Sequence, residues 1–181
     1  MENKKKLIVF IDSGDTLVNE STEVLDEYGN VVSADLIEGA EEMIRGLYKQ
    51  GYRIALVADG RTRSFENVYN RHNIYHVFEV KVISEEEGVH KPDLKMFTEA
   101  MKRMGLTDSD KHRIVMVGNN LKRDIIGANR AGITSILLSW STRYCMQPET
   151  EEETPDHVVA THLELTALLD VLERQVDSRE S

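Results

Sequence analysis

The sequence has a single cysteine, Cys145, among its 181 residues. One thiol cannot form an intramolecular disulfide, so the fold must be stabilised without such cross-links, as is usual in a reducing compartment. Long apolar runs are also missing. The basic start, residues 1–6, is followed by only five apolar residues before Asp12. A secretory signal or a bilayer-spanning helix needs a longer run, so we expect a cytoplasmic protein.

Basic residues are outnumbered, with 22 Lys and Arg against 32 Asp and Glu, which gives a formal net charge of −10. Nonspecific binding to nucleic acid depends on neutralising phosphates with Lys and Arg, and anionic membranes attract the same residues. The sequence therefore predicts neither partner. With 40% hydrophobic residues and 181 residues in all, it is typical of one soluble domain with a sizeable core.

Apolar segments alternate with segments of helical periodicity along most of the chain. Apolar runs predict buried strands at 6–12, where no polar residue alternates, and at 53–59 and 113–119, with further strands at 80–84, 134–140 and 157–160. Apolar residues three and four apart predict helices at 41–50, 64–72, 92–104, 121–131 and 163–176. This alternation favours right-handed crossovers, and so an α/β fold built on a doubly wound, mostly parallel sheet.

We expect residues 1–181 to form a single domain, with three segments outside the alternating pattern. Residues 22–33 place alternating apolar residues around a Gly-Asn pair, which predicts a β-hairpin. Because it follows the first strand directly, it could lean over the strand ends as a small flap or be merely decorative. Residues 145–155 predict an acidic surface loop, and residues 177–181 predict a polar tail that frays.

Polar side chains gather where the predicted strands end. Asp12, Asp59 and Asn119 end or follow three of the strands, with Asp124 shortly after the last of these and Lys91 before a helix. A single carboxylate in such a place is commonly a turn or capping residue. Because parallel strands end at one edge of the sheet, the whole set predicts a ligand-binding site there.

Three segments carry a resemblance to a known family. FIDSGDTLVNE at 10–20, HKPDLKMF at 90–97 and VGNNLKRDIIGANRAG at 117–132 resemble the motifs of the haloacid dehalogenase superfamily, in order and spacing. The resemblance spans about 6–140 and implies its doubly wound α/β fold. Motif spacing leaves no room for a large cap domain. The resemblance also implies hydrolysis of a small phosphate monoester, since most members are phosphatases.

The resemblance assigns roles to individual residues. Asp12 matches the nucleophile, which would form an aspartyl phosphate. Lys91 matches the lysine that holds nucleophile and phosphate together, and Thr16 matches a phosphate-binding threonine. These roles are implied by the resemblance alone.

The implied cofactor is Mg²⁺, with Asp12, the backbone carbonyl of Gly14, Asn119 and Asp124 as ligands. Asn119 departs from the family pattern, which has an aspartate at this position. An amide oxygen can still bind Mg²⁺, a hard ion that prefers oxygen ligands, but one negative charge is lost.

A second departure concerns the acid/base residue. The family has an aspartate two residues after the nucleophile, where this chain has Gly14, followed by Asp15. In an extended chain, residues two apart face the same way and residues three apart do not. A positive φ at Gly14 could redirect the chain and let Asp15 reach the leaving group. We expect Asp15 to be a displaced acid, unless the leaving group needs none.

The third departure is Ala58, which replaces the serine or threonine that ends the second strand in the family. Backbone N–H groups of Asp59 and Gly60 could still donate to phosphate. The carboxylate of Asp59 would repel phosphate unless Arg61 or Arg63 pairs with it.

These departures leave alternatives open. Loss of a general acid and of one hydrogen-bond donor could together slow a phosphatase about 10⁴-fold or more. A catalytically silent scaffold with a binding or regulatory role is one alternative, and a metal-independent, dehalogenase-type hydrolase is another. The lack of a cap implies an exposed site that a large substrate or a neighbouring subunit would close, so a homo-oligomer is also open. The substrate cannot be read from the sequence.

Overall fold

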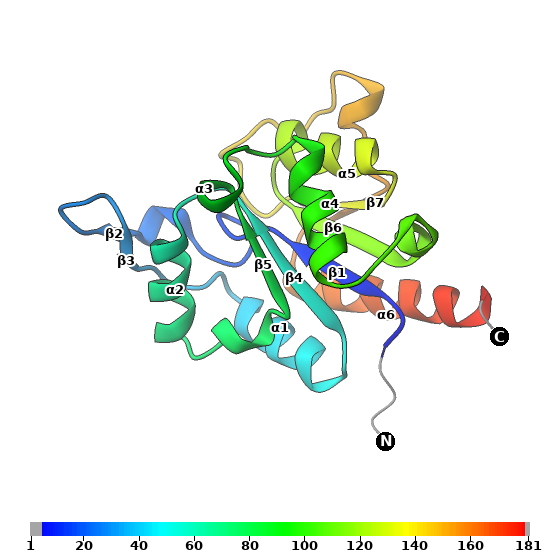
Figure 1. The fold of residues 1–181 in the computed structure, drawn as a ribbon, viewed down its shortest axis with the longest axis horizontal. Coiled ribbons are helices and arrows are strands. Elements are labelled where there is room, and N and C mark those ends of the chain that lie inside the picture. The colour runs from blue at the N-terminus through cyan, green and yellow to red at the C-terminus, as the bar shows by residue number, and fades with distance from the viewer. Residues whose placement is uncertain (1–4, 180–181) are drawn as a thin grey trace.

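A computed structural model describes residues 5–179 and contains one six-stranded sheet with helices on both faces (Figure 1). The strands are β1 (Ile8–Ile11), β4 (Arg53–Ala58), β5 (Val80–Ile83), β6 (Ile114–Gly118), β7 (Thr134–Leu138) and β8 (His157–Val159). Their order is β5-β4-β1-β6-β7-β8, and every neighbouring pair is parallel. The predicted α/β fold with a parallel, doubly wound sheet is confirmed.

Successive side chains of β1 point to opposite faces of the sheet, as the pleat requires. The helices are α1 (Ala40–Lys49), α2 (Thr62–Arg71), α3 (Ser84–Glu87), α4 (Leu94–Arg103), α5 (Ile126–Ala131) and α6 (His162–Arg179). Ile8 and Phe10 pack in the cluster formed with α4 and α5, whereas Val9 and Ile11 pack with α1, α2 and α6. All four are fully buried, which explains why this strand has no polar alternation.

The order of the strands creates a crevice at the end of β1. The chain crosses from β1 to β4 on one side and later reaches β6 on the other, so connections diverge beyond the carboxyl end of β1. Ligands of open α/β sheets bind at such a switch point. Asp12 lies there, and its N–H extends the ladder by donating to the carbonyl of Val117 at 2.9 Å.

The predicted hairpin is present, as β2 (Val24–Leu25) paired with β3 (Val31–Ser33). It projects at the left of Figure 1 and contacts α2. The backbone of Val31 donates to Ser64 Oγ at 2.9 Å and accepts from Asn67 Nδ2 at 2.9 Å. Residues 22–33 do not line the cavity around Asp12 described below, so a role as a flap stays a prediction.

The acidic segment 145–155, predicted to be a surface loop, is exposed at most positions and is attached to the rest of the protein near its end. It contains a 3-10 helix, Glu151–Glu153, in which Glu153 is buried. The side chain of Asn129, on α5, donates to the carbonyls of Glu152 and Thr154 at 2.8 and 3.0 Å. These hydrogen bonds fix the end of the segment against α5.

Residues 177–179 of the predicted polar tail form the last turn of α6, which continues to Arg179, and fraying of this end stays a prediction. An ion pair between Lys6 and Asp177, at 2.9 Å, stabilises this last turn. Residues 180 and 181 lie outside the described part of the chain. Among residues 5–179, neither α6 nor any shorter helix has the length and apolarity that crossing a bilayer needs.

Gly127 of α5 faces Phe97 of α4, and its lack of a side chain allows the two helices to pack closely. A Cβ added to Gly127 would lie 2.3 Å from Phe97 Cε2. We expect Gly127→Ala to lower the free energy of unfolding by about 1–3 kcal/mol, as overpacking does. Gly46→Ala on α1 is the control, because no atom lies within 4 Å of the added Cβ; it should stabilise by about 0.5–1 kcal/mol. Urea unfolding measures both, and a fully stable Gly127→Ala variant would refute the close packing.

Candidate active site

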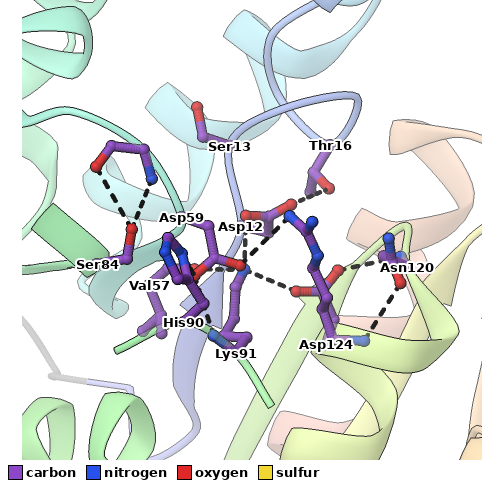
Figure 2. A network of polar contacts seen from close by, with 12 residues as sticks. Asp12, Ser13, Thr16, Val57, Asp59, Ser84, His90, Lys91, Asn120 and Asp124 are labelled. Atoms are coloured by element: carbon purple, nitrogen blue, oxygen red, sulfur yellow. Dashed lines mark hydrogen bonds and ion pairs between the residues drawn. The ribbon is translucent and has the colours of Figure 1, made fainter. Parts of the chain in front are cut away.

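Three charged side chains from distant segments meet at the carboxyl end of β1. The ammonium of Lys91 lies 2.7 Å from Asp12 Oδ1 and 2.7 Å from Asp124 Oδ1, and it donates to the carbonyl of Val57 at 2.9 Å. Figure 2 shows this ammonium between the two carboxylates. The lysine side chain is 1% exposed, so its charge is compensated almost entirely by these groups.

The electrostatic balance keeps Lys91 charged. Burial alone would lower the pKa of its ammonium, but the carboxylates of Asp12 and Asp124 outweigh burial and raise it. Burial raises the pKa of Asp124, and Lys91 opposes that rise only in part. Two acids thus share one buried cation. Asp12 is the more accessible of the two, with 13% of its side chain exposed against 1% for Asp124.

The four predicted magnesium ligands line one small cavity of about 40 Å³: Asp12, Gly14, Asn119 and Asp124. Asn119 is 1% exposed, and its Nδ2 has no acceptor among residues 5–179. Buried polar groups without partners are uncommon, and this N–H group could donate to an oxygen of a bound ligand, whereas only the amide oxygen of Asn119 could bind a cation. The described residues contain no group of three or more His, Cys, Asp or Glu that could hold a metal ion, and only two of these four predicted ligands are carboxylates. The set nevertheless offers oxygen donors only, which fits a hard cation such as Mg²⁺.

Asp124 is positioned by an irregular first turn before α5. Residues Leu121–Ile125 form a π-helical turn, although the sequence predicted one regular helix over 121–131. Asp124 Oδ2 accepts the N–H of Asn120 at 3.0 Å. A Cβ on Gly118 would lie 2.2 Å from Asp124 Cγ, so a glycine at the end of β6 makes room for this carboxylate. Such π turns are frequent at functional sites.

Thr16 contacts the predicted nucleophile rather than the cavity. Its Oγ1 donates to Asp12 Oδ2 at 3.4 Å, and the residue is fully buried. Its carbonyl accepts from His162 Nε2 at 2.7 Å. Burial lowers the pKa of His162 and so favours the neutral ring. Thr16 thus orients Asp12, and its binding to phosphate stays a prediction.

Asp59 lies beside the cation and lines the same cavity. Its Oδ1 accepts the backbone N–H of Lys91 at 3.0 Å. Arg123 approaches Oδ2 at 3.6 Å, and His90 approaches Oδ1 at 3.6 Å. The positive charge of Arg123 reduces the repulsion that an unpaired carboxylate would exert on a phosphate.

Neither Arg61 nor Arg63, the two arginines that could have offset the charge of Asp59, pairs with it. The guanidinium of Arg61 donates to the carbonyl of Tyr28 in the hairpin, and Arg63 lies 3.6 Å from Glu66 one turn along α2. Because α2 starts at Thr62, both arginines are directed towards the hairpin and the helix surface.

Ala58 and Gly60 do not line the cavity, although both are predicted phosphate-binding positions. Ala58 is buried at the end of β4. The N–H of Gly60 donates to Ser84 Oγ at 2.9 Å (Figure 2). This N–H group is therefore already hydrogen-bonded within the protein. Ser84 is a polar residue that sequence reasoning missed, and its place at the end of a predicted strand was the available signal.

The loop after β1 bends at a different residue from the predicted one. Gly14 is not in the left-handed region, whereas Asp15 has a φ of 47°, so the predicted reason for the bend is wrong. Aspartate tolerates this conformation better than most residues. The Asp15 carboxylate is buried; its Oδ1 accepts the N–H of Glu20 at 3.1 Å, and its Oδ2 pairs with Arg143. Asp15 does not line the cavity, and its acid/base role stays a prediction.

Glu20 and Arg143 are polar residues near the site that sequence reasoning missed. Glu20 lines the cavity with Asp12. Burial raises the pKa of Glu20, and the negative charge of Asp15 adds to this rise. Arg143 comes from the segment after β7 and pairs with both acids. Neither residue carries a spacing signal, because both reach the site through irregular segments.

A larger cavity of about 400 Å³ adjoins the small one. Asn120, Arg123 and Tyr144 line both cavities. Its volume lies in the range of small-molecule sites. The pair of cavities can therefore hold a small substrate with its reacting group near Asp12.

The sequence of this chain is similar to those of several known phosphatases. The glyceraldehyde 3-phosphate phosphatase of Methanothermobacter thermautotrophicus is 35% identical over 125 residues, which are 69% of this chain and 50% of that protein. The ribulose-1,5-bisphosphate 5-phosphatase of Halopiger xanaduensis is 32% identical over 139 residues, 74% of this chain and 56% of that protein. The chain thus spans about half the length of the curated relatives it matches.

Solved structures share the fold at low identity. A Listeria monocytogenes protein is 23% identical with a TM-score of 0.74, covering 93% of this chain and 99% of that one. The HAD-hydrolase YfnB of Bacillus subtilis, solved with bound magnesium, is 16% identical with a TM-score of 0.74, covering 92% and 100%. Residues 6–138 match the family described as haloacid dehalogenase-like hydrolase, which is most of the chain. The chain belongs to the haloacid dehalogenase-like hydrolases.

Proposed function

We propose that this protein hydrolyses a small phosphate monoester, with Asp12 as the nucleophile. The observation that carries the proposal is the position of Lys91, 2.7 Å from both Asp12 and Asp124 at the cavity. An oxygen of Asp12 attacks phosphorus and the ester oxygen leaves, which forms an aspartyl phosphate. Water then releases inorganic phosphate. Lys91 orients Asp12 and stabilises negative charge on the transferred group.

The proposed substrates are small phosphorylated metabolites such as sugar phosphates. The matching relatives named above are phosphatases of glyceraldehyde 3-phosphate and ribulose-1,5-bisphosphate. The adjoining cavity of about 400 Å³ suits a leaving group of that size, and Arg123 lines both this cavity and the one that contains Asp12. A homo-oligomer that would close this open site stays a prediction.

We further propose Mg²⁺ as the cofactor, held by Asp12, the carbonyl of Gly14, Asn119 and Asp124. A bound Mg²⁺ neutralises charge on the phosphoryl group during transfer. The four residues line one cavity, where Lys91 donates to one oxygen of each of the two carboxylates.

Magnesium is expected to stabilise the folded protein. A ligand that binds only the folded state adds about 2.7 kcal/mol at roughly 100 times its Kd, so Tm should rise by several degrees. Asn119→Ala should reduce this rise because it removes one oxygen ligand without touching Lys91. Asn70→Ala, at an exposed position on α2, is the matched control and should keep the full rise. A wild-type Tm that is the same in Mg²⁺ and in EDTA would contradict the proposed metal site.

The function itself is tested by measuring release of inorganic phosphate from a panel of small phosphate esters, with Mg²⁺ and with EDTA. We expect Mg²⁺-dependent turnover of at least one of them. Binding of tungstate without turnover of any ester would favour the silent scaffold. Release of halide from a haloacid, independent of metal, would favour the dehalogenase-type hydrolase.

A further inference from the structure

Four carboxylates line the cavity around the nucleophile: Asp12, Glu20, Asp59 and Asp124. Three of them are bound to Lys91, through its ammonium or its backbone N–H. Glu20 differs, because it is held from the other side by Arg143, whose Nη1 lies 3.1 Å from Oε2. Glu20 is therefore the cavity carboxyl group that is not engaged by the central lysine.

The carboxyl group of Glu20 lies where a side chain at position 14 would be. A Cβ built on Gly14 would lie 1.9 Å from Glu20 Oε1 and 2.8 Å from its Cδ. Gly14 has no left-handed φ, so its backbone does not require glycine. The missing Cβ instead leaves room for the carboxyl group of Glu20. This group occupies the place that a side chain at position 14, two residues after Asp12, would take.

Local hydrogen bonds fix this orientation. Glu20 begins a short 3-10 helix, Glu20–Thr22, which is capped by the side chain of Asn19. The N–H of Glu20 donates to Asp15 Oδ1 at 3.1 Å, and Arg143 pairs with both acids. With Oε2 held by Arg143, Oε1 is the oxygen that faces Gly14.

We propose that Glu20 is the general acid and base of this reaction, an inference that rests on the proposed function. As Asp12 attacks phosphorus, the bond from phosphorus to the ester oxygen breaks, and that oxygen takes the proton of Glu20. In the second step the Glu20 carboxylate takes a proton from water as the water oxygen attacks phosphorus. The bond from phosphorus to Asp12 then breaks, leaving inorganic phosphate, a free Asp12 carboxylate and a protonated Glu20.

The test compares two substrates with Glu20→Gln in the presence of Mg²⁺. Glycerol 3-phosphate has an alkoxide leaving group that needs a proton, whereas the nitrophenolate of 4-nitrophenyl phosphate leaves without one. Because kcat/KM covers the steps up to the phosphoenzyme, it should fall about 10²–10⁴-fold for the alkyl ester and change little for the aryl ester. Loss of the base in the second step should produce a burst of 4-nitrophenol.

Two further variants keep the result interpretable. Glu23→Gln alters an exposed acid close to Glu20 that does not line the cavity, and it should match wild type on both esters. Gly14→Asp combined with Glu20→Ala returns a carboxyl group to the same space and should recover part of the alkyl ester activity lost by Glu20→Ala alone.

Opposite outcomes separate this inference from the proposed function. An equal fall on both esters, or no fall on either, in a folded Glu20→Gln variant would overturn the role of Glu20 and leave the phosphatase proposal standing. Failure of the wild-type protein to hydrolyse any phosphate ester would overturn the phosphatase proposal, and the role of Glu20 with it.

Discussion

Asp12→Asn is expected to lower turnover of phosphate esters by about 10⁴-fold or more, the scale seen when a nucleophile or its essential partner is removed. An uncharged amide does not attack phosphorus, so no phosphoenzyme forms. The substitution keeps the shape of the side chain, and the amide oxygen can still accept from Lys91, which donates to Asp12 at 2.7 Å. Phosphate release measures the loss directly.

Two observations make the Asp12 result specific. Acid-quenched wild-type protein should carry a covalent phosphoryl group that mass spectrometry places on Asp12, and the variant should lack it. Asp35→Asn, an exposed aspartate that does not line the cavity, is the control and should retain full turnover. Wild-type turnover by a correctly folded Asp12→Asn variant would exclude Asp12 as the nucleophile.

Lys91→Met is expected to have the largest effect on stability. Its ammonium is the cation between Asp12 and Asp124, and the side chains of Lys91 and Asp124 are each 1% exposed. Removing one partner of a buried ion pair leaves an uncompensated buried charge, which costs about 3–5 kcal/mol. Urea unfolding at neutral pH should therefore show a lower free energy of unfolding, together with loss of turnover.

A second substitution tests whether the unpaired carboxylate causes the loss. Lys91→Met with Asp124→Asn removes cation and anion together, so the double variant should be more stable than the sum of the single effects indicates. Lys122→Met replaces an exposed lysine and should change stability by no more than about 0.5 kcal/mol. Additive effects of the two buried substitutions would show that their charges are not coupled.

Much of the fold follows from local sequence patterns. The buried strands are visible because a strand covered on both faces, such as Ile8–Ile11, has no polar positions. The hairpin is signalled by Gly29 and Asn30 between short apolar segments. The π-helical turn over Leu121–Ile125 is not predictable in this way, because it depends on the contacts of Asp124 with Asn120 and Lys91.

The site, too, is predictable only where it follows from the pattern of strands. Asp12, Lys91, Asn119 and Asp124 could be placed together because the ends of parallel strands meet at one edge of the sheet. Glu20 could not, since no rule of strand topology determines how an irregular loop folds back.

The contacts of Arg143 have a consequence for ligand selection. One guanidinium from the segment after β7 neutralises two acids in the loop after β1, and it also lines the 400 Å³ cavity. Any anionic substituent entering that cavity competes with the loop for the same positive charge. Arg143 therefore links two properties of the protein. The same side chain that could bind an anionic group of the ligand also holds the loop after β1 in place.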